Sequence, residues 1–186
     1  MLRYAGQVGE RVTALGLDQS AHWVRTIAQA GGSNRSQNPY SADYACSGTA
    51  DGTYIKSIIA TLPSIGGILY FDAGSYAIDT QLVIPGHVKV MGAGYNVTRF
   101  NAASNIDPFW FVQTGTPDEF IGGGFSDATI SATGATVIGI RISHIQHFDL
   151  SRIKFQSSAC ARCVQVDGAS FHTRIQDCRL VSFSQY

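Results

Sequence analysis

The chain has 186 residues, of which 45% are hydrophobic and 14% are charged, a composition typical of one folded domain. Thirteen basic and thirteen acidic residues give a formal net charge of zero, so neither nucleic acid nor an anionic membrane surface is expected as a partner. Charged residues interrupt the first thirty positions, which argues against a signal peptide or a membrane-spanning segment there.

Residues 1–40 differ from the rest of the chain, and we expect them to form an appendage that attaches the protein to something else. We expect a short helix there, capped by Asp18 or Ser20 and stopped by Gly31-Gly32, with Ala21, Val24, Ile27 and Ala28 on one face. A polar, turn-rich linker over residues 33–39 follows. Residues 41–186 are then expected to form the main body.

A second helix is expected to open the main body. Asp51 or Thr53 can cap it, and Pro63 follows its end. Its apolar face consists of Tyr54, Ile55, Ile58, Ile59 and Leu62. Short strands are expected next, over residues 68–71, 76–78, 82–84 and 88–90. An amphipathic helix in this place would cover the apolar end and the unpaired strand edges of a stacked β structure.

Three segments repeat one pattern at equal intervals, beginning at Phe125, Leu150 and Ile175. In each, an apolar residue is followed by two polar residues, and then by apolar, polar and apolar residues. Alternating apolar residues indicate a strand with one buried face, and the polar pair indicates a sharp corner. A fixed period of this length is typical of stacked repeats. The pattern therefore predicts an all-β fold, a parallel β-helix.

The opening of the main body resembles a known family. Gly48-Thr49-Ala50-Asp51, the helix, and then residues 66–76 and 84–94 resemble the start of the pectate-lyase-like right-handed parallel β-helix proteins. The resemblance covers about residues 43–186 and implies a right-handed β-helix with an N-terminal capping helix. The family includes polysaccharide lyases, glycoside hydrolases and bacteriophage tailspikes and tail fibres. Asp72 stands where the family often has proline.

The 25-residue period should place Asp127, Arg152 and Asp177 in one column at a corner, with alternating charges. Thr129, Lys154 and Arg179 should form a second column on the outer face. These columns are either a binding stripe for an acidic or hydroxyl-rich ligand or a solvated ladder of ion pairs, each worth about 0–1 kcal/mol. We favour the ladder. The inner columns contain apolar residues and indicate core, and there Ile140 and Ile142 match Val164 and Val166 at a spacing of 24.

Candidate catalytic residues are Asp149 with Arg174, and Asp127 with Asp177. Asp149 and Arg174 could approach each other across adjacent repeats, as a lyase base beside a carboxylate held by calcium requires. A glycoside hydrolase needs two carboxylates, for which Asp127 and Asp177 are the candidates. No acidic cluster indicates a calcium site, so we expect no cofactor, with calcium entering only under the lyase alternative.

Three further sets of residues are candidates for binding. Trp110 lies between two phenylalanines, and we expect it to face outward as a platform for a sugar ring, unless the loop around Pro117 covers it. His147 and His172 are one period apart and could stack, as a metal ligand pair or a pH sensor, or they are ordinary surface residues. Cys160 and Cys163 have the spacing of a zinc knuckle but lack a second pair, so no metal site is expected.

The first of two functional hypotheses is a virion-associated β-helix protein of the phage tailspike or tail-fibre type. It would attach to other virion or tail proteins through residues 1–40 and recognise host-surface polysaccharide, as a homotrimer in the virion tail. The alternative is an extracellular polysaccharide lyase or glycoside hydrolase. The pattern stops at Tyr186 within a repeat, so we expect either a longer polypeptide or another chain to cover that end.

Overall fold

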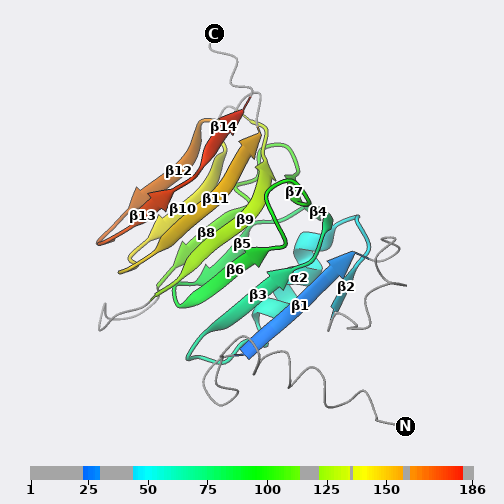
Figure 1. The fold of residues 1–186 in the computed structure, drawn as a ribbon, viewed down its shortest axis with the longest axis horizontal. Helices are drawn as coiled ribbons and strands as arrows, with labels where there is room; N and C mark the ends of the chain where they lie inside the picture. The colour runs from blue at the N-terminus through cyan, green and yellow to red at the C-terminus, as the bar shows by residue number, and fades with distance from the viewer. Residues whose placement is uncertain (1–22, 30–43, 114–121, 135, 157–159, 182–186) are drawn as a thin grey trace.

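The computed structural model describes residues 23–29, 44–113, 122–134, 136–156 and 160–181 (Figure 1). The fold is predominantly β, and every strand pair in these ranges is parallel. The strands are β1 (Trp23–Gln29), β2 (Tyr44–Cys46), β3 (Gly67–Phe71), β4 (Gly74–Ile78), β5 (Leu82–Pro85), β6 (Val88–Gly92), β7 (Thr98–Ala102), β8 (Phe109–Val112), β9 (Gly124–Ser131), β10 (Ile138–Ser143), β11 (Asp149–Gln156), β12 (Arg162–Asp167), β13 (Arg174–Gln176) and β14 (Arg179–Val181).

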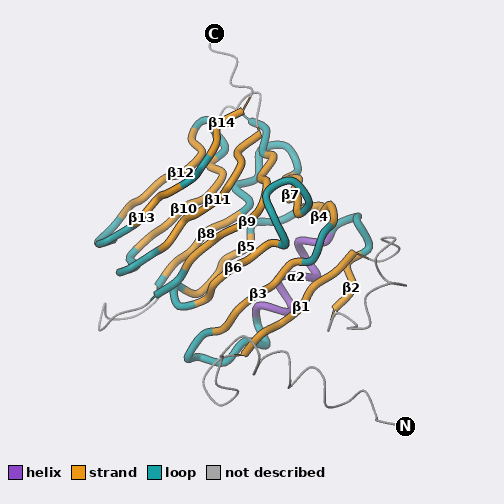
Figure 2. The backbone as a smooth tube through the Cα atoms, in the orientation of Figure 1, coloured by secondary structure: helices purple, strands orange, loops and turns teal. Residues whose placement is uncertain are grey.

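These strands form two sheets. The larger has the order β13-β11-β9-β6-β3-β1-β2, with β4, β7 and β14 paired beside that path, and the smaller has the order β12-β10-β8-β5. Figure 2 shows the chain returning repeatedly to each sheet, so that each new strand lies beside the one that the chain left there on its previous pass. Helix α2 (Asp51–Ile59) contacts β2, β4 and β5. No helix in the described ranges has the length and apolar character needed to cross a membrane.

The 25-residue spacing is confirmed as strand register. Leu150 pairs with Phe125 on one side and with Ile175 on the other. Each segment turns a corner at its polar pair, because Asp127, Arg152 and Asp177 have φ values of 61°, 52° and 53°. This left-handed conformation is rare for residues other than glycine and ends one straight strand segment before the next begins. In the smaller sheet the register spacing between β10 and β12 is 24, as predicted from their apolar residues.

The core lies between the two sheets and is rich in aromatic rings. Phe100, Phe109 and Phe125 are fully buried, and their ring centroids lie 4.8–5.8 Å apart. Edge-on packing of this kind adds about 0.5–1.5 kcal/mol per pair beyond the burial of the rings. Gly123 precedes Phe125 at a point where an added Cβ atom would collide with the carbonyl oxygen of Gly86. This close approach explains why glycine stands where the next repeat has Phe148.

The helix expected around Val24 and Ile27 is a wrong prediction, because residues 23–29 form strand β1. This strand lies between β2 and β3 in the larger sheet. Val24, Thr26 and Ile27 are β-branched and favour an extended backbone, and Ile27 is fully buried against the sheet. The helical spacing of the apolar residues was therefore a weaker signal than the β-branched residues in this segment. The linker and the remainder of residues 1–40 fall outside the described residues.

Helix α2 is confirmed, but neither Asp51 nor Thr53 caps it as expected. The N-cap is Ala50, with no side-chain hydrogen bond, and Asp51 lies inside the first turn. The Asp51 carboxylate is 1% exposed and accepts hydrogen bonds from the backbone N–H groups of Gly48 and Ala77, each at 2.9 Å. It also accepts one from the Gln29 side chain. Asp51 therefore ties β1, α2 and β4 together.

Candidate functional site

Trp110 lies on the outward side of β8, as the sequence predicted. Its neighbours Phe109 and Phe111 are fully buried, whereas the Trp110 side chain is half-buried. The alternation of a strand places consecutive side chains on opposite faces, so Trp110 must lie on the face away from the core. The loop around Pro117, considered above as a cover for Trp110, falls outside the described residues.

Parallel register builds two rows of side chains on the outward face of the smaller sheet. Val83, Trp110, Arg141 and Gln165 are successive register partners across β5, β8, β10 and β12, and Pro85, Val112, Ser143 and Asp167 form the neighbouring row. We call this surface the Trp110 face. It is formed by residues from four strands that are close only because the sheet brings them together.

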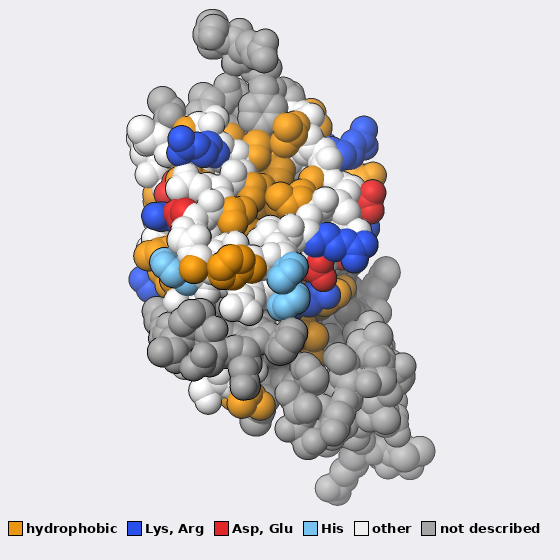
Figure 3. Space-filling model, turned by 90° about the vertical axis from the view of Figure 1, so that its left-hand side faces the viewer, with side chains coloured by type: hydrophobic (Ala, Val, Ile, Leu, Met, Phe, Trp, Pro, Cys, Tyr) orange, Lys and Arg blue, Asp and Glu red, His pale blue; other side chains and the backbone are white. Residues whose placement is uncertain are grey.

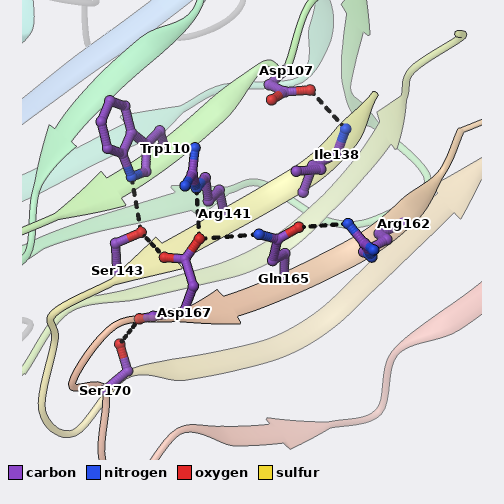
Figure 4. A network of polar contacts seen from close by, with 9 residues as sticks. All are labelled: Asp107, Trp110, Ile138, Arg141, Ser143, Arg162, Gln165, Asp167 and Ser170. Atoms are coloured by element: carbon purple, nitrogen blue, oxygen red, sulfur yellow. Dashed lines mark hydrogen bonds and ion pairs between the residues drawn. The ribbon is translucent and has the colours of Figure 1, made fainter. Parts of the chain in front are cut away.

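Hydrogen bonds hold the Trp110 face in one arrangement (Figure 4). The indole Nε1–H of Trp110 donates to Ser143 Oγ at 3.1 Å, and the Ser143 hydroxyl in turn donates to Asp167. Asp167 also accepts from Arg141 Nε at 2.8 Å and from Gln165 Nε2 at 3.0 Å. The guanidinium carbon of Arg141 lies 5.1 Å from the centre of the indole ring, within the range of a cation–π contact.

Asp167 is held as an anion at the centre of this network. Burial favours the neutral carboxyl, but hydrogen bonds from Ser143, Gln165 and Arg141 outweigh it, and together they lower the pKa of Asp167. A lowered pKa suits a fixed acceptor and not a general acid, which needs a raised one. The network therefore positions Trp110 and Arg141. On its far side Arg162 donates to Gln165 Oε1 at 2.9 Å and is itself exposed.

The predicted stacking of charged residues at one corner is confirmed for Asp127 and Arg152. They form a bidentate ion pair across adjacent repeats. The hydrogen bonds from Arg152 are the main reason that the pKa of Asp127 is lowered. Asp177 lies at the next corner and contributes a favourable charge interaction with Arg152. Both of these features favour the ion ladder over a ligand-binding stripe.

The second column differs from the expectation at Thr129. This side chain is 2% exposed, because its hydroxyl donates to the carbonyl oxygen of Tyr95 and is covered there. Its partners Lys154 and Arg179 are half-buried and exposed respectively. Exposure in this column therefore rises from the buried Thr129 to the exposed Arg179.

Asp149 and Arg174 are register partners on β11 and β13, and both are exposed. Among the described residues the ion pairs are those of Arg141 with Asp167 and of Arg152 with Asp127, so Asp149 and Arg174 are adjacent without a salt bridge. The structure brings the proposed pair together, as the 25-residue period predicted.

His147 and His172 stack with ring centroids 4.7 Å apart and planes at 8°. Both occupy left-handed corners, one repeat apart, with φ values of 57° and 55°. No group of three or more His, Cys, Asp or Glu side chains able to hold a metal is found among the described residues.

The cysteine pair at Cys160 and Cys163 is not poised to bind metal as thiolates. Burial and the neighbouring Cys160 thiol raise the pKa of Cys163 to about 12, which keeps the Cys163 thiol protonated.

The outward position of Trp110 was found from the sequence, but the residues that surround it were missed. The inner residues Ile140 and Ile142 match Val164 and Val166 at a spacing of 24, and that same spacing aligns Arg141 with Gln165 and Ser143 with Asp167. The sequence spacing that aligns the outward residues could therefore have been read from the apolar residues that alternate with them. The separation of Trp110 from its register partner Arg141 along the sequence fits neither period.

Comparisons with known proteins leave the family open. No family model and no curated protein matches the chain, so membership of the pectate-lyase-like family is not shown. A solved structure, ORF18 of Geobacillus virus E2, is similar with 16% sequence identity and a TM-score of 0.49. The match covers 83% of this chain and 29% of that one, so the chain spans less than a third of its length. A likeness at this level is no basis for transferring a function.

Proposed function

We propose that the Trp110 face binds saccharide, and that the protein is a virion-associated β-helix protein that recognises host-surface polysaccharide. The observation that carries the proposal is the fixed indole of Trp110, flanked by polar groups from neighbouring strands. Saccharide sites need a flat apolar surface with a few positioned hydrogen-bonding groups around it. Trp110 supplies the first, and Arg141, Gln165 and Arg162 supply the second.

The finer fold assignment belongs to the same proposal. Parallel strands that return to each sheet, at intervals of 24 or 25 residues from β9 and β10 onward and with left-handed corners in register, support a right-handed parallel β-helix. The resemblance to pectate-lyase-like proteins, which covers about residues 43–186, points in the same direction. Attachment through residues 1–40 and assembly as a homotrimer in the tail remain predictions.

The enzyme alternative rests on Asp149 and Arg174. They are adjacent and exposed, which a lyase base and its partner would need. Asp127 and Asp167 are poor general acids, because each is held in its ionised form by hydrogen bonds from an arginine.

A panel of acidic and neutral bacterial surface polysaccharides tests the proposal. We expect Trp110→Ala to weaken binding of any polysaccharide that the wild-type chain binds by about tenfold or more, since truncating a tryptophan that anchors a binding surface typically costs about 2 kcal/mol or more. Tyr54→Ala is the matched control, because Tyr54 is also a partly exposed aromatic residue, on α2. Equal affinity of the Trp110→Ala variant and the wild type would reject the Trp110 face as the site.

The same incubations separate binding from catalysis. The appearance of reducing or unsaturated ends, lost in Asp149→Asn or Arg174→Gln, would favour the enzyme alternative. Binding without new ends supports the recognition role.

A further inference from the structure

A row of basic side chains crosses the outward face of strands β7, β9, β11 and β14. Its members are successive register partners, Arg99, Thr129, Lys154 and Arg179, and we call them the basic row. Phe100 and Phe155, which alternate with members of the row, are buried, so the row lies on the side away from the core. Figure 3 views the molecule from the side of β12, β13 and β14 and shows Lys and Arg side chains on the two flanks, outside an apolar middle.

Charges alternate in sign at the neighbouring corner but not in the basic row. At the corner, Arg152 is ion-paired with Asp127 and is also attracted to Asp177. In the row, Lys154 lies directly opposite Arg179. Like charges on directly paired residues destabilise a sheet. The corner therefore satisfies its own charges, whereas the row contains a repulsion that a bound anion would relieve.

The two inner cations of the row, Arg99 and Lys154, are not neutralised by the strands that flank them. Arg99 has Ser75 and Thr129 as register partners, and Lys154 has Thr129 and Arg179. Described strands therefore lie on both sides of each cation, and neither side offers an acid. The ion pairs within the part of the chain that the structure describes involve other side chains. Arg99 and Lys154 are thus available to an external anion.

The spacing of the cations favours an extended ligand. Neighbouring strands lie about 4.8 Å apart, so Lys154 and Arg179 are separated by one such spacing and Arg99 and Lys154 by two, about 10 Å. The whole row covers about 14 Å of the sheet. A polymer that carries anionic groups at regular intervals contacts all three cations at once, whereas a small anion contacts one or two of them.

Uncharged polar side chains accompany the row and indicate which kind of polymer it fits. Asn101 and Ser131 are register partners two positions beyond Arg99 and Thr129, and they too lie on the outward side. Asn101 Nδ2 donates to Ser75 Oγ at 2.6 Å, which orients the amide. Amides and hydroxyls of this kind bond to sugar hydroxyls. A protein partner instead needs an apolar centre in its interface, and these outward positions of β7 and β9 are polar.

We propose that the basic row binds an acidic polysaccharide that runs across the strands of the larger sheet. Its anionic groups lie beside Arg99, Lys154 and Arg179, and its hydroxyls bond to Asn101 and Ser131. The inference deepens the proposed recognition of surface polysaccharide, on which it rests, by adding a second face that selects for charge. This face is separate from the Trp110 face, which belongs to the smaller sheet.

Binding to alginate and to hyaluronan, two polysaccharides with a carboxylate in each repeating unit, tests the proposal. We expect the 186-residue chain to bind at least one of them at low salt, and to bind it more weakly as salt rises to about 0.3 M, because exposed charges are then screened. The carboxyl-reduced form of that polymer keeps its hydroxyls and should bind at least about fivefold more weakly. Absence of salt-sensitive binding to both polymers would overturn the proposal.

Matched double variants locate the binding. Arg99→Gln with Lys154→Gln removes two cations from the row, and Lys56→Gln with Lys89→Gln removes two exposed cations elsewhere, on α2 and β6. We expect the first variant to bind the acidic polymer at least about fivefold more weakly than the wild type, and the second to bind it equally. Arg99→Lys with Lys154→Arg keeps both charges and should keep the binding.

Three further results would each overturn the proposal. Equal binding by the two glutamine double variants would remove the row as the site. Equally tight binding of polyglutamate, which has carboxylates but no sugar hydroxyls, would show that the row fits an acidic polypeptide. Binding that is lost in Trp110→Ala and kept in the Arg99→Gln, Lys154→Gln variant would assign the polymer to the Trp110 face alone. Binding lost in the row variant and kept in Trp110→Ala supports the row, whatever the Trp110 face binds.

Discussion

Arg152 donates two hydrogen bonds to Asp127, from Nε to Oδ1 at 2.5 Å and from Nη2 to Oδ2 at 2.6 Å. Both residues occupy left-handed corners of adjacent repeats. The ion pair therefore joins two positions whose backbone conformation is itself unfavourable for most residues. Charge and backbone contribute separately here, and two substitutions of Asp127 can distinguish them.

Asp127→Asn should cost less stability than Asp127→Val. Asparagine tolerates the left-handed conformation and loses only the ion pair, worth about 0–1 kcal/mol because Arg152 is half exposed. Valine loses the ion pair and adds about 1–2 kcal/mol of backbone strain. Urea unfolding monitored by circular dichroism measures both. Equal losses for the two variants would mean that the corner conformation carries no cost.

Acid should destabilise the protein through Asp127 and Asp167. Hydrogen bonds hold the pKa of each folded-state carboxyl below its usual value. Their contribution is therefore complete above the unfolded pKa, about 4, and is lost as the pH falls through the lower folded value. The free energy of unfolding should fall below about pH 5, and less steeply in an Asp127→Asn, Asp167→Asn double variant. Identical pH profiles would contradict this account.

The position of an apolar residue within its inward column should decide how much stability is lost when its side chain is truncated. Leu150→Ala removes a fully buried side chain and should cost about 2–5 kcal/mol. Ile175→Ala, in the same column, should cost less than about 1 kcal/mol, because Ile175 is half exposed. Thermal and urea unfolding of the two variants compares them directly. A large loss for Ile175→Ala would show that something covers the end in solution.

Asp51 should be more costly to lose than an ordinary first-turn acid. Asp51→Ala leaves the backbone N–H groups of Gly48 and Ala77 without their acceptor. A buried unpaired N–H costs about 1–3 kcal/mol, and we expect a loss within that range in total, because Gly48 is exposed and can bond to water instead. Asp51→Asn keeps one side-chain oxygen and should lose less. The urea midpoints of the two variants and the wild type are compared. Equal midpoints for Asp51→Ala and the wild type would contradict the stabilising role of the Asp51 carboxylate.

The repeat was predictable because its signal is local and periodic. Leu150 and its partners are apolar at fixed intervals, and parallel pairing needs only that interval to set the register. The corner at Arg152 was predictable for the same reason, as two polar residues interrupt the alternation. Strand β1 was not, since a few apolar residues in so short a segment fit a helix or a strand equally well, and its burial depends on pairing with β3, far away in the sequence.

The Trp110 face was predictable only in part. The outward position of Trp110 follows from its buried neighbours, a local property of β8. Its contact with Arg141 follows from the pairing of β8 with β10, and the segment between these strands does not keep the period. Residues gathered by an irregular connection leave no spacing signal in the sequence.

Tryptophan fluorescence tests the saccharide-binding role of the Trp110 face most directly. The chain has two tryptophans, and Trp23→Phe leaves Trp110 as the single reporter. Titration with a polysaccharide fragment that the chain binds should change the Trp110 emission saturably, with the same dissociation constant as the binding measurement. Saturable binding that leaves the Trp110 emission unchanged would contradict the account.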